Sequence, residues 1–106
     1  MTMEHRFSPR LPFPLHVALW ARGAVVAQGV CRDVSRDGMY VYVDPACLHR
    51  NALVEVEFMT PDGQGHLCLP AMVAHCGNDG IGLVFDELAE PQALRMLRAY
   101  LQSLPS

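Results

Sequence analysis

Two short groups of residues in this chain have the chemistry of an anion-binding site. Arg6 and Arg10 lie near the N-terminus with three residues between them. An arginine guanidinium is planar and permanently charged, so it can pair bidentately with a phosphate or with a guanine edge. Asp33, Ser35 and Gly38 form the second group, which supplies a carboxylate acceptor, a hydroxyl and a flexible backbone position. Together the two groups suit a small anionic guanine nucleotide, whereas either group alone is a weak signal.

The chain around these two groups predicts six short strands. Residues 1–14 contain prolines at 9, 12 and 14, so we expect them to form a flexible arm and not regular structure. After the arm, runs rich in apolar, aromatic and β-branched residues alternate with turn signals that contain Gly, Asp and Asn. The expected strands are 15–20, 24–34, 39–43, 53–58, 66–76 and 81–85, with Gly29 as a candidate bulge.

The last segment of the chain has the period of a helix. Leucines at 94, 97, 101 and 104 fall on one helical stripe, and Pro91 suits a first helical turn. Six short antiparallel strands favour a closed barrel, because closure removes exposed sheet edges. We therefore predict an all-β fold, a six-stranded antiparallel β-barrel over residues 15–106 that includes a C-terminal α-helix at about 90–104.

Composition narrows the class of partner. The chain has 106 residues, about half of them apolar, which is enough for one packed domain. Its net charge of −3 argues against a nucleic-acid polymer as partner. No apolar run approaches the length of a membrane span, and the four cysteines form no CxxC pair. We expect a cytoplasmic protein with reduced thiols and no direct membrane insertion, in which Cys31, Cys47 and Cys68 are small core residues.

Other groups of reactive residues have simpler interpretations. The spacing of His66, Cys68, His75 and Cys76 matches no common zinc pattern. The chain contains neither a nucleophile elbow nor a phosphate-cradling glycine-rich loop. The sequence therefore predicts no metal site and no enzymatic activity.

Taken in order, the motifs resemble those of a known family. Arg6 and Arg10, then the turn with Asp33, Ser35 and Gly38, and then a late strand at 80–85 together look like a PilZ domain. The resemblance covers the chain from Arg6 to the C-terminal helix. It implies a six-stranded β-barrel that binds the bacterial second messenger cyclic di-GMP, with no further cofactor. The arginine motif would lie on the flexible arm and fold over the ligand, while the second motif would lie on the barrel surface.

The chemistry of the five matching residues agrees with this implied ligand. An arginine can engage O6 and N7 of guanine, and a second can stack on a base or pair with a phosphate. Asp33 can accept from N1–H and the N2 amino group of guanine, and Ser35 can donate to a phosphate. Gly38 is expected to allow a positive φ and a close approach of the ligand.

Two further residues are weaker candidates for the ligand site. His5 occupies the position before the first arginine, where the family resemblance implies an influence on the number of ligand molecules bound. Arg36 either reaches a phosphate or is a solvated turn arginine.

Two functions remain open from the sequence. The first is a cyclic di-GMP receptor that changes conformation on binding and signals to an unidentified protein partner in motility, biofilm or polysaccharide control. The alternative is a ligand-independent PilZ-fold interaction protein in type IV pilus assembly, a type that typically lacks the arginine pair. In either case we expect a monomer or a weak homodimer, with Tyr40, Tyr42, Met96 and Tyr100 as candidate contact residues.

Overall fold

The computed structural model describes residues 10–89 and 91–104, which form seven strands, one short 3₁₀ turn and one α-helix. The strands are β1 (Leu11–Pro12), β2 (His16–Ala21), β3 (Ala24–Val34), β4 (Gly38–Tyr42), β5 (Leu53–Met59), β6 (His66–Cys76) and β7 (Gly80–Phe85). The 3₁₀ turn η2 spans Pro45–Cys47, and the helix α1 spans Pro91–Ser103.

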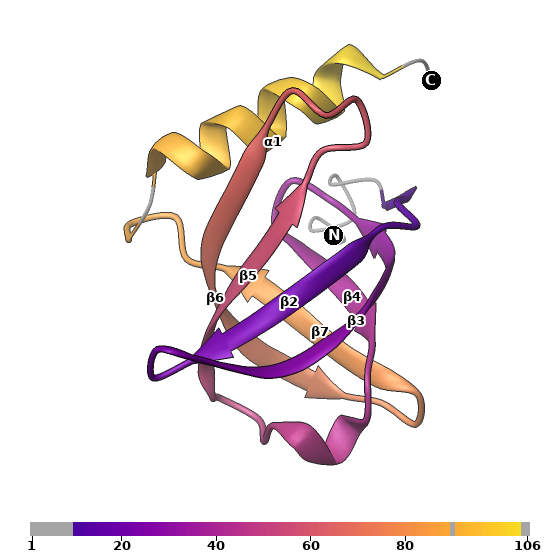
Figure 1. Cartoon of the computed structure of the whole chain (residues 1–106), viewed down its shortest axis with the longest axis vertical. Helices are drawn as coiled ribbons and strands as arrows, with labels where there is room; N and C mark the ends of the chain where they lie inside the picture. Colours follow the sequence, from indigo (N-terminus) through magenta and orange to yellow (C-terminus); the bar gives the residue numbers. More distant parts are fainter. Residues whose placement is uncertain (1–9, 90, 105–106) are drawn as a thin grey trace, which may run out of the picture.

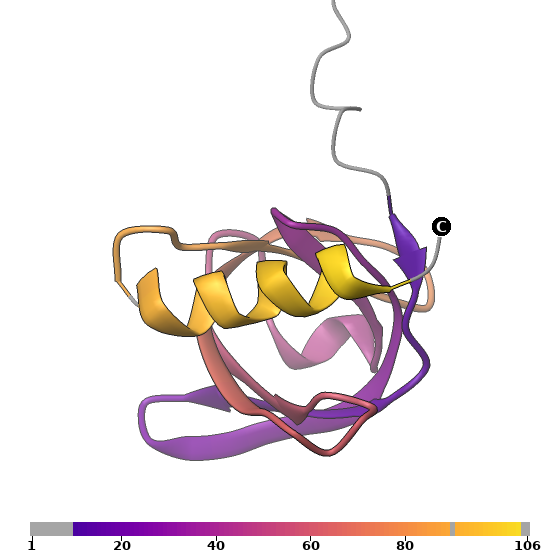
Figure 2. The same ribbon diagram turned by 90° about the horizontal axis from the view of Figure 1, so that it is seen from above.

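Strands β2 to β7 form a closed antiparallel barrel (Figure 1). The strands follow the order β1-β3-β2-β5-β6-β7-β4, and a further pairing of β3 with β4 closes the sheet on itself. Seen from above, α1 lies across one end of the barrel (Figure 2). The predicted fold class, a six-stranded antiparallel barrel with a C-terminal helix, is confirmed, and β1 is an additional strand.

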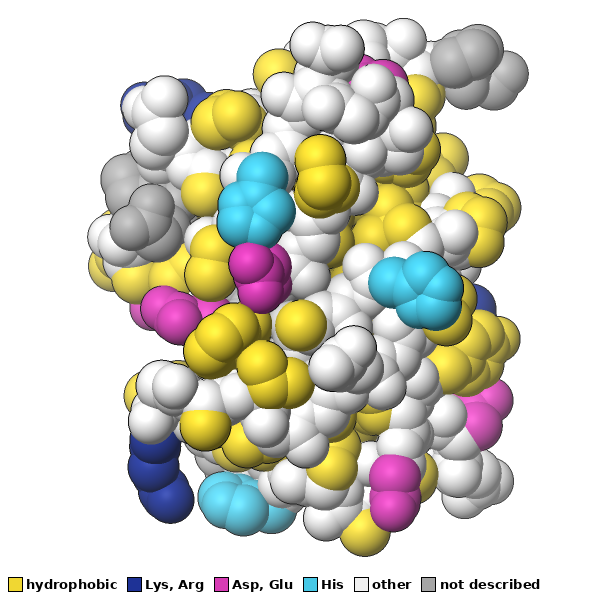
Figure 3. Space-filling view, viewed as in Figure 1, with side chains coloured by type: hydrophobic (Ala, Val, Ile, Leu, Met, Phe, Trp, Pro, Cys, Tyr) yellow, Lys and Arg dark blue, Asp and Glu magenta, His cyan; other side chains and the backbone are white. Residues whose placement is uncertain are grey.

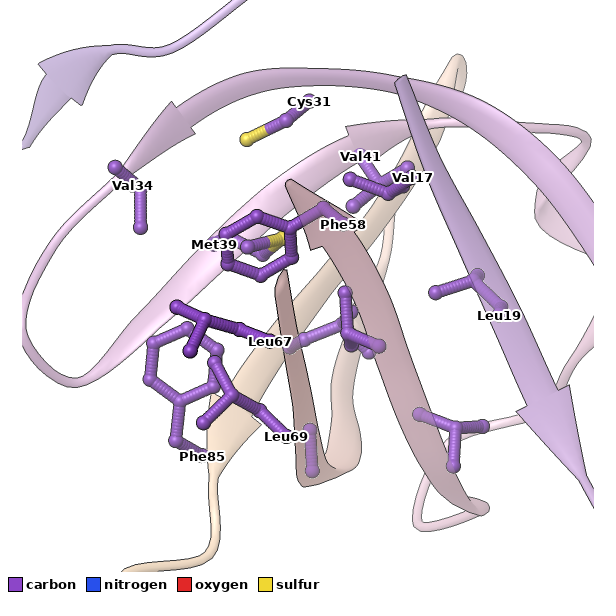
Figure 4. Close-up of a cluster of buried hydrophobic side chains, with 14 of the residues drawn as sticks. Val17, Leu19, Cys31, Val34, Met39, Val41, Phe58, Leu67, Leu69 and Phe85 are labelled. Atoms are coloured by element: carbon purple, nitrogen blue, oxygen red, sulfur yellow. The ribbon is translucent and has the colours of Figure 1, made fainter. Parts of the chain in front are cut away.

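The barrel interior is filled by side chains that alternate along each strand. In β5, Val54, Val56 and Phe58 are buried while the residues between them face outward. Figure 4 shows Val17, Leu19, Met39, Val41, Phe58, Leu67 and Leu69 among the side chains that converge on this core. This period of two is what an antiparallel sheet with one buried face requires.

Helix α1 closes one end of the core through its leucine stripe. Leu94 and Leu97 are 2% and 0% exposed, and Leu101 is partly buried against the same cluster. Tyr100 packs at a ring-centroid distance of 6.1 Å from Phe13, which lies 6.0 Å from Phe58 in an edge-to-face arrangement. The helix therefore fixes the segment around Phe13, which directly follows β1.

Strand β1 falls where the sequence predicted only a loop. Leu11 pairs with Val34, and Pro12 pairs with Asp33 at the edge of the sheet. A proline lacks the N–H that a central strand needs, but an edge strand tolerates it. The number of prolines alone could not predict this pairing. The pairing depends on the burial of Phe13 (2% exposed), which holds the segment against the barrel.

The bulge expected at Gly29 is wrong. Gly29 pairs regularly with Val17, and an added Cβ there would meet the carbonyl oxygen of Tyr42. Close packing against the end of β4 therefore accounts for this glycine. A register shift instead occurs between Cys31 and Asp33, where β3 uses Arg32 as an extra residue opposite β4.

Candidate functional site

The structure brings one residue of each predicted motif into direct contact. Nε of Arg10 donates to Oδ1 of Asp33 at 2.6 Å. The pairing of Pro12 with Asp33 places the start of β1 beside the end of β3, so Arg10 reaches this carboxylate. His5 and Arg6, the other arm residues of the predicted site, lie outside the described residues.

A second arginine binds the same carboxylate. Nε of Arg32 donates to Oδ2 of Asp33 at 2.7 Å. The side chain of Asp33 is only 17% exposed, whereas those of Arg10 and Arg32 are 46% and 44% exposed. Each oxygen of this largely buried carboxylate thus accepts from a more exposed cation. An incoming ligand with its own donors can replace these arginine contacts.

Burial and the two arginines shift the pKa of Asp33 in opposite directions. Desolvation by burial raises the pKa of its carboxyl, while hydrogen bonds and charges from Arg32 and Arg10 lower it. The arginines outweigh burial, so the pKa of Asp33 is lowered from its ordinary value. The carboxylate is therefore an acceptor at neutral pH.

The register shift in β3 explains why two successive residues, Arg32 and Asp33, both lie on the outer side of the barrel. Cys31 and Val34 are 1% and 0% exposed, although regular alternation would bury only one of two residues three apart. The bulge at Arg32 resolves this, because it re-aims the two residues between them toward the surface. The odd spacing of two apolar residues was the sequence signal for this bulge.

Sequence reasoning missed the aromatic support of Arg32. Its guanidinium carbon lies 4.0 Å from the ring centroid of Tyr40, a cation–π contact. Tyr40 donates its hydroxyl to Oδ1 of Asp79 at 2.7 Å, and this hydrogen bond, followed by burial, raises the pKa of Tyr40. Tyr40 is 8% exposed, so it supports the site and is not an exposed contact residue, unlike its neighbour Tyr42, which is 42% exposed.

Ser35 and Gly38 form the tight turn between β3 and β4. The backbone N–H of Ser35 donates to the carbonyl of Gly38 at 2.8 Å, and Oγ of Ser35 accepts from the N–H of Asp37 at 3.2 Å. Ser35 is 2% exposed. In this arrangement its hydroxyl oxygen stabilises the turn that follows Asp33.

The positive φ predicted for Gly38 is wrong. Among the described glycines only Gly23 and Gly63 have positive φ. An added Cβ at Gly38 would instead overlap the carbonyl oxygen of Leu83 on β7. This glycine permits close approach of a neighbouring strand, and so it fixes the position of the turn on the barrel.

Arg36 lies at the tip of the same turn and is exposed. Its carbonyl accepts from Nε of Arg98 on α1 at 2.9 Å, and Arg36 is one of the residues that line a groove between the turn and that helix. The helix therefore holds the backbone of the turn beside this groove.

The residues considered for zinc are not gathered into a site. Within residues 10–89 and 91–104, no group of three or more His, Cys, Asp or Glu side chains could hold a metal ion. Nε2 of His66 instead contacts Oε2 of Glu57 at 2.8 Å. Cys31 is buried as predicted, whereas Cys68 is exposed and Cys47 only partly buried, so the core assignment is wrong for Cys68.

Other surfaces of the barrel lack the predicted site residues. The face in Figure 3 carries apolar, acidic and histidine side chains, with basic ones at its margins. A hollow of about 640 Å³ lined mainly by apolar residues, including Leu53, Pro70 and Met72, contains none of the predicted ligand residues. In the described part of the chain no helix is both long enough and apolar enough to span a bilayer.

The structure defines the class of this protein as a small closed β-barrel domain, with a helix across one end and an arginine–carboxylate contact at its rim. The family model for the PilZ domain matches residues 4–103, and the chain belongs to this family. PilZ domains are regulatory and binding domains of the cyclic di-GMP-binding type.

A solved structure supports the same assignment. The chain is similar to the PilZ domain of CeSA from a cellulose-synthesizing bacterium, with 26% sequence identity and a TM-score of 0.72. The match covers 90% of this chain and 99% of that one. No curated protein matches the chain significantly.

Proposed function

We propose that this chain is a receptor for cyclic di-GMP, bound between the N-terminal arm and the turn after β3. The observation that carries the proposal is the contact of Arg10 with Asp33, which joins the two motifs at one place. Asp33, Ser35 and Gly38 would form the fixed part of the site. Arg10, with Arg6 and His5 before it in the sequence, would form the part that moves.

Binding would exchange one set of charge-assisted hydrogen bonds for another. Asp33 now accepts from Arg10 and Arg32, and guanine offers N1–H and the N2 amino group as replacement donors. Arg10 would then be released to pair with guanine O6 and N7 or with a phosphate. Because adenine lacks the N1–H and the N2 amino group, the carboxylate would select guanine.

Movement of the arm would be the output signal. Ordering a backbone segment costs about 1–2 kcal/mol per residue, so a few charge-assisted contacts must balance it. We propose that the rearranged arm is recognised by a protein partner in the cytoplasm, without catalysis by this chain and without another cofactor. The similarity to a domain from a cellulose-synthesizing bacterium favours polysaccharide control among the three processes considered.

Calorimetric titration with cyclic di-GMP tests the receptor function, with cyclic di-AMP and GMP as control ligands. We expect binding that is selective for the guanine dinucleotide and is weakened about tenfold or more by Arg10→Ala and by Asp33→Ala. Arg50→Ala is the matched control, because Arg50 is an exposed arginine in the connection between η2 and β5. Absence of heat and of a thermal shift with the wild-type protein would favour the ligand-independent interaction protein instead.

Amide exchange tests the proposed signal separately. We expect the amides of residues 4–10, which precede the paired strand β1, to be protected in the presence of cyclic di-GMP and to exchange faster in its absence. Equal protection in both conditions would contradict a moving arm, even if the calorimetric titration shows binding.

A further inference from the structure

A groove with three arginines lies between α1 and the turn that carries the candidate site. It has a volume of about 670 Å³ and is lined by Arg36, Arg95 and Arg98 together with Leu11, Leu101 and Gln102. Arg95, Arg98 and Gln102 follow one stripe of the helix, since residues three and four apart share a face. Within the described residues, no carboxylate lines this groove.

The three arginines differ in how their charges are balanced. Arg98 donates to the carbonyl of Arg36, contacts Oδ1 of Asp37 at 3.3 Å and contacts Oε1 of Glu87 at 3.1 Å. Its charge is compensated, and its side chain is only 22% exposed. Arg98 therefore has a structural role: it forms one wall of the groove and holds the turn against the helix.

Arg36 and Arg95 have no such compensation within the described part of the chain. Arg95 donates only to the neutral Oε1 of Gln92 at 3.1 Å, and the guanidinium of Arg36 makes no ion pair there. Arg36 and Arg95 both line the groove, and two uncompensated like charges on such residues repel each other. An anion bound between them would convert this repulsion into attraction. A phosphate group offers the oxygens that two guanidinium forks can bind at once.

We infer that this groove is a binding site for a phosphate-bearing anion, held by Arg36 and Arg95 against the wall formed by Arg98. Leu11 and Leu101 supply apolar sides that reduce solvent around the ion pairs. The site lies directly beside the Arg10–Asp33 contact, because Leu11 follows Arg10 and Arg36 belongs to the same turn as Ser35. Its phosphate could belong to the nucleotide of the neighbouring site or to a separate small anion.

Titration with inorganic pyrophosphate at low ionic strength tests the groove directly. Binding is measured by calorimetry and by changes in the amide chemical shifts of α1. We expect binding by the wild-type protein, about tenfold weaker binding by Arg36→Gln or Arg95→Gln, and no detectable binding by the double variant. Arg50→Gln is the control and should bind as the wild type does. Absence of wild-type binding, or unchanged binding by the double variant, would overturn the inference.

The variants are expected to remain folded, because neither guanidinium makes an ion pair within the described part of the chain. Equal thermal midpoints for wild type and double variant check this point. Asp33→Ala should keep its affinity for pyrophosphate even if it loses cyclic di-GMP. Loss of pyrophosphate binding by Asp33→Ala, with an unchanged thermal midpoint, would place the anion at the neighbouring site and overturn the groove.

The source of the phosphate follows from a competition experiment. If saturating cyclic di-GMP excludes pyrophosphate, the groove holds a phosphate of that dinucleotide. If both bind together, the groove takes an independent anion. Both results support a phosphate site in the groove. In the first case Arg36→Gln and Arg95→Gln should weaken the binding of cyclic di-GMP, and in the second case they should leave it unchanged.

Discussion

Arg10 and Asp33 are separated by 22 residues in the sequence, yet their side chains form a contact of 2.6 Å at the rim of the barrel. The contact depends on β1, which places Pro12 opposite Asp33. A two-residue edge strand is a small element, held on one side by a backbone pairing and on the other by burial of Phe13. The same carboxylate also accepts from Arg32, so its protonation reports on both arginines.

The pKa of Asp33 should respond to each arginine. We expect NMR titration to give a value below the ordinary Asp range of about 3.9, and a higher value in Arg10→Gln and Arg32→Gln. The lowered pKa in the folded state means that the contribution of Asp33 to stability is present above its unfolded pKa. That contribution is lost as the pH falls through the folded value.

Denaturation at two pH values measures this contribution. The difference in unfolding free energy between wild type and Asp33→Asn should be larger at pH 7 than at about pH 3, which lies below the unfolded pKa of about 3.9. The same difference at both pH values would show that the two arginines do not stabilise the fold through this carboxylate.

Gly38, the glycine of the predicted site, should not tolerate replacement by alanine. Gly38→Ala would push a methyl group into the carbonyl oxygen of Leu83, and we expect a loss of roughly 1–3 kcal/mol in stability from the strand shift. Gly82→Ala is the matched control in β7, because its added Cβ would make only an ordinary contact of 3.5 Å with Cβ of His75. Urea denaturation of the two variants measures the difference. Equal stability of both would contradict the packing role assigned to Gly38.

The cysteines should differ sharply in reactivity. Burial, and then the negative charge of Asp33, raises the pKa of Cys31 to about 12, so almost no thiolate is present at neutral pH. Cys68 is exposed. We expect a maleimide to label Cys68 rapidly and Cys31 only after denaturation, as measured by mass spectrometry of peptides. Rapid labelling of Cys31 in the native protein would show that the end of β3 opens more readily than its burial implies.

The sequence predicted most of the barrel because its strands follow simple rules. The alternation of Val54, Val56 and Phe58 with acidic residues defines β5, and the leucine stripe defines α1. These are local patterns with a period of two or of 3.6 residues. They required no knowledge of which strands are neighbours.

The details that sequence reasoning missed all depend on contacts between distant segments. β1 forms because Phe13 is buried against Phe58 and Tyr100. Gly38 is required by a carbonyl group on β7, and Arg32 is held by Tyr40 on β4. The pairing of Arg10 with Asp33 was predicted only as two motifs of one site, because residue types indicate a shared ligand without giving the distance between them.

Arg10 and Arg32 bind the same carboxylate, and their variants separate a ligand contact from a supporting residue. In the proposed receptor Arg10 moves onto the ligand, whereas Arg32 remains stacked on Tyr40. Arg10→Gln should therefore weaken cyclic di-GMP binding about tenfold. Arg32→Gln removes an exposed ion pair, which contributes little in water, and should change the affinity by no more than about fivefold in either direction.

Calorimetric titration of both variants at one ionic strength measures this difference, with Arg50→Gln as the control for loss of a positive charge elsewhere. Arg32→Gln should also keep its selectivity for guanine over adenine, since Asp33 and Arg10 remain. A tenfold loss with Arg32→Gln and none with Arg10→Gln would reverse the two roles. The cation held by Tyr40 would then be the ligand contact, and Arg10 would only neutralise Asp33.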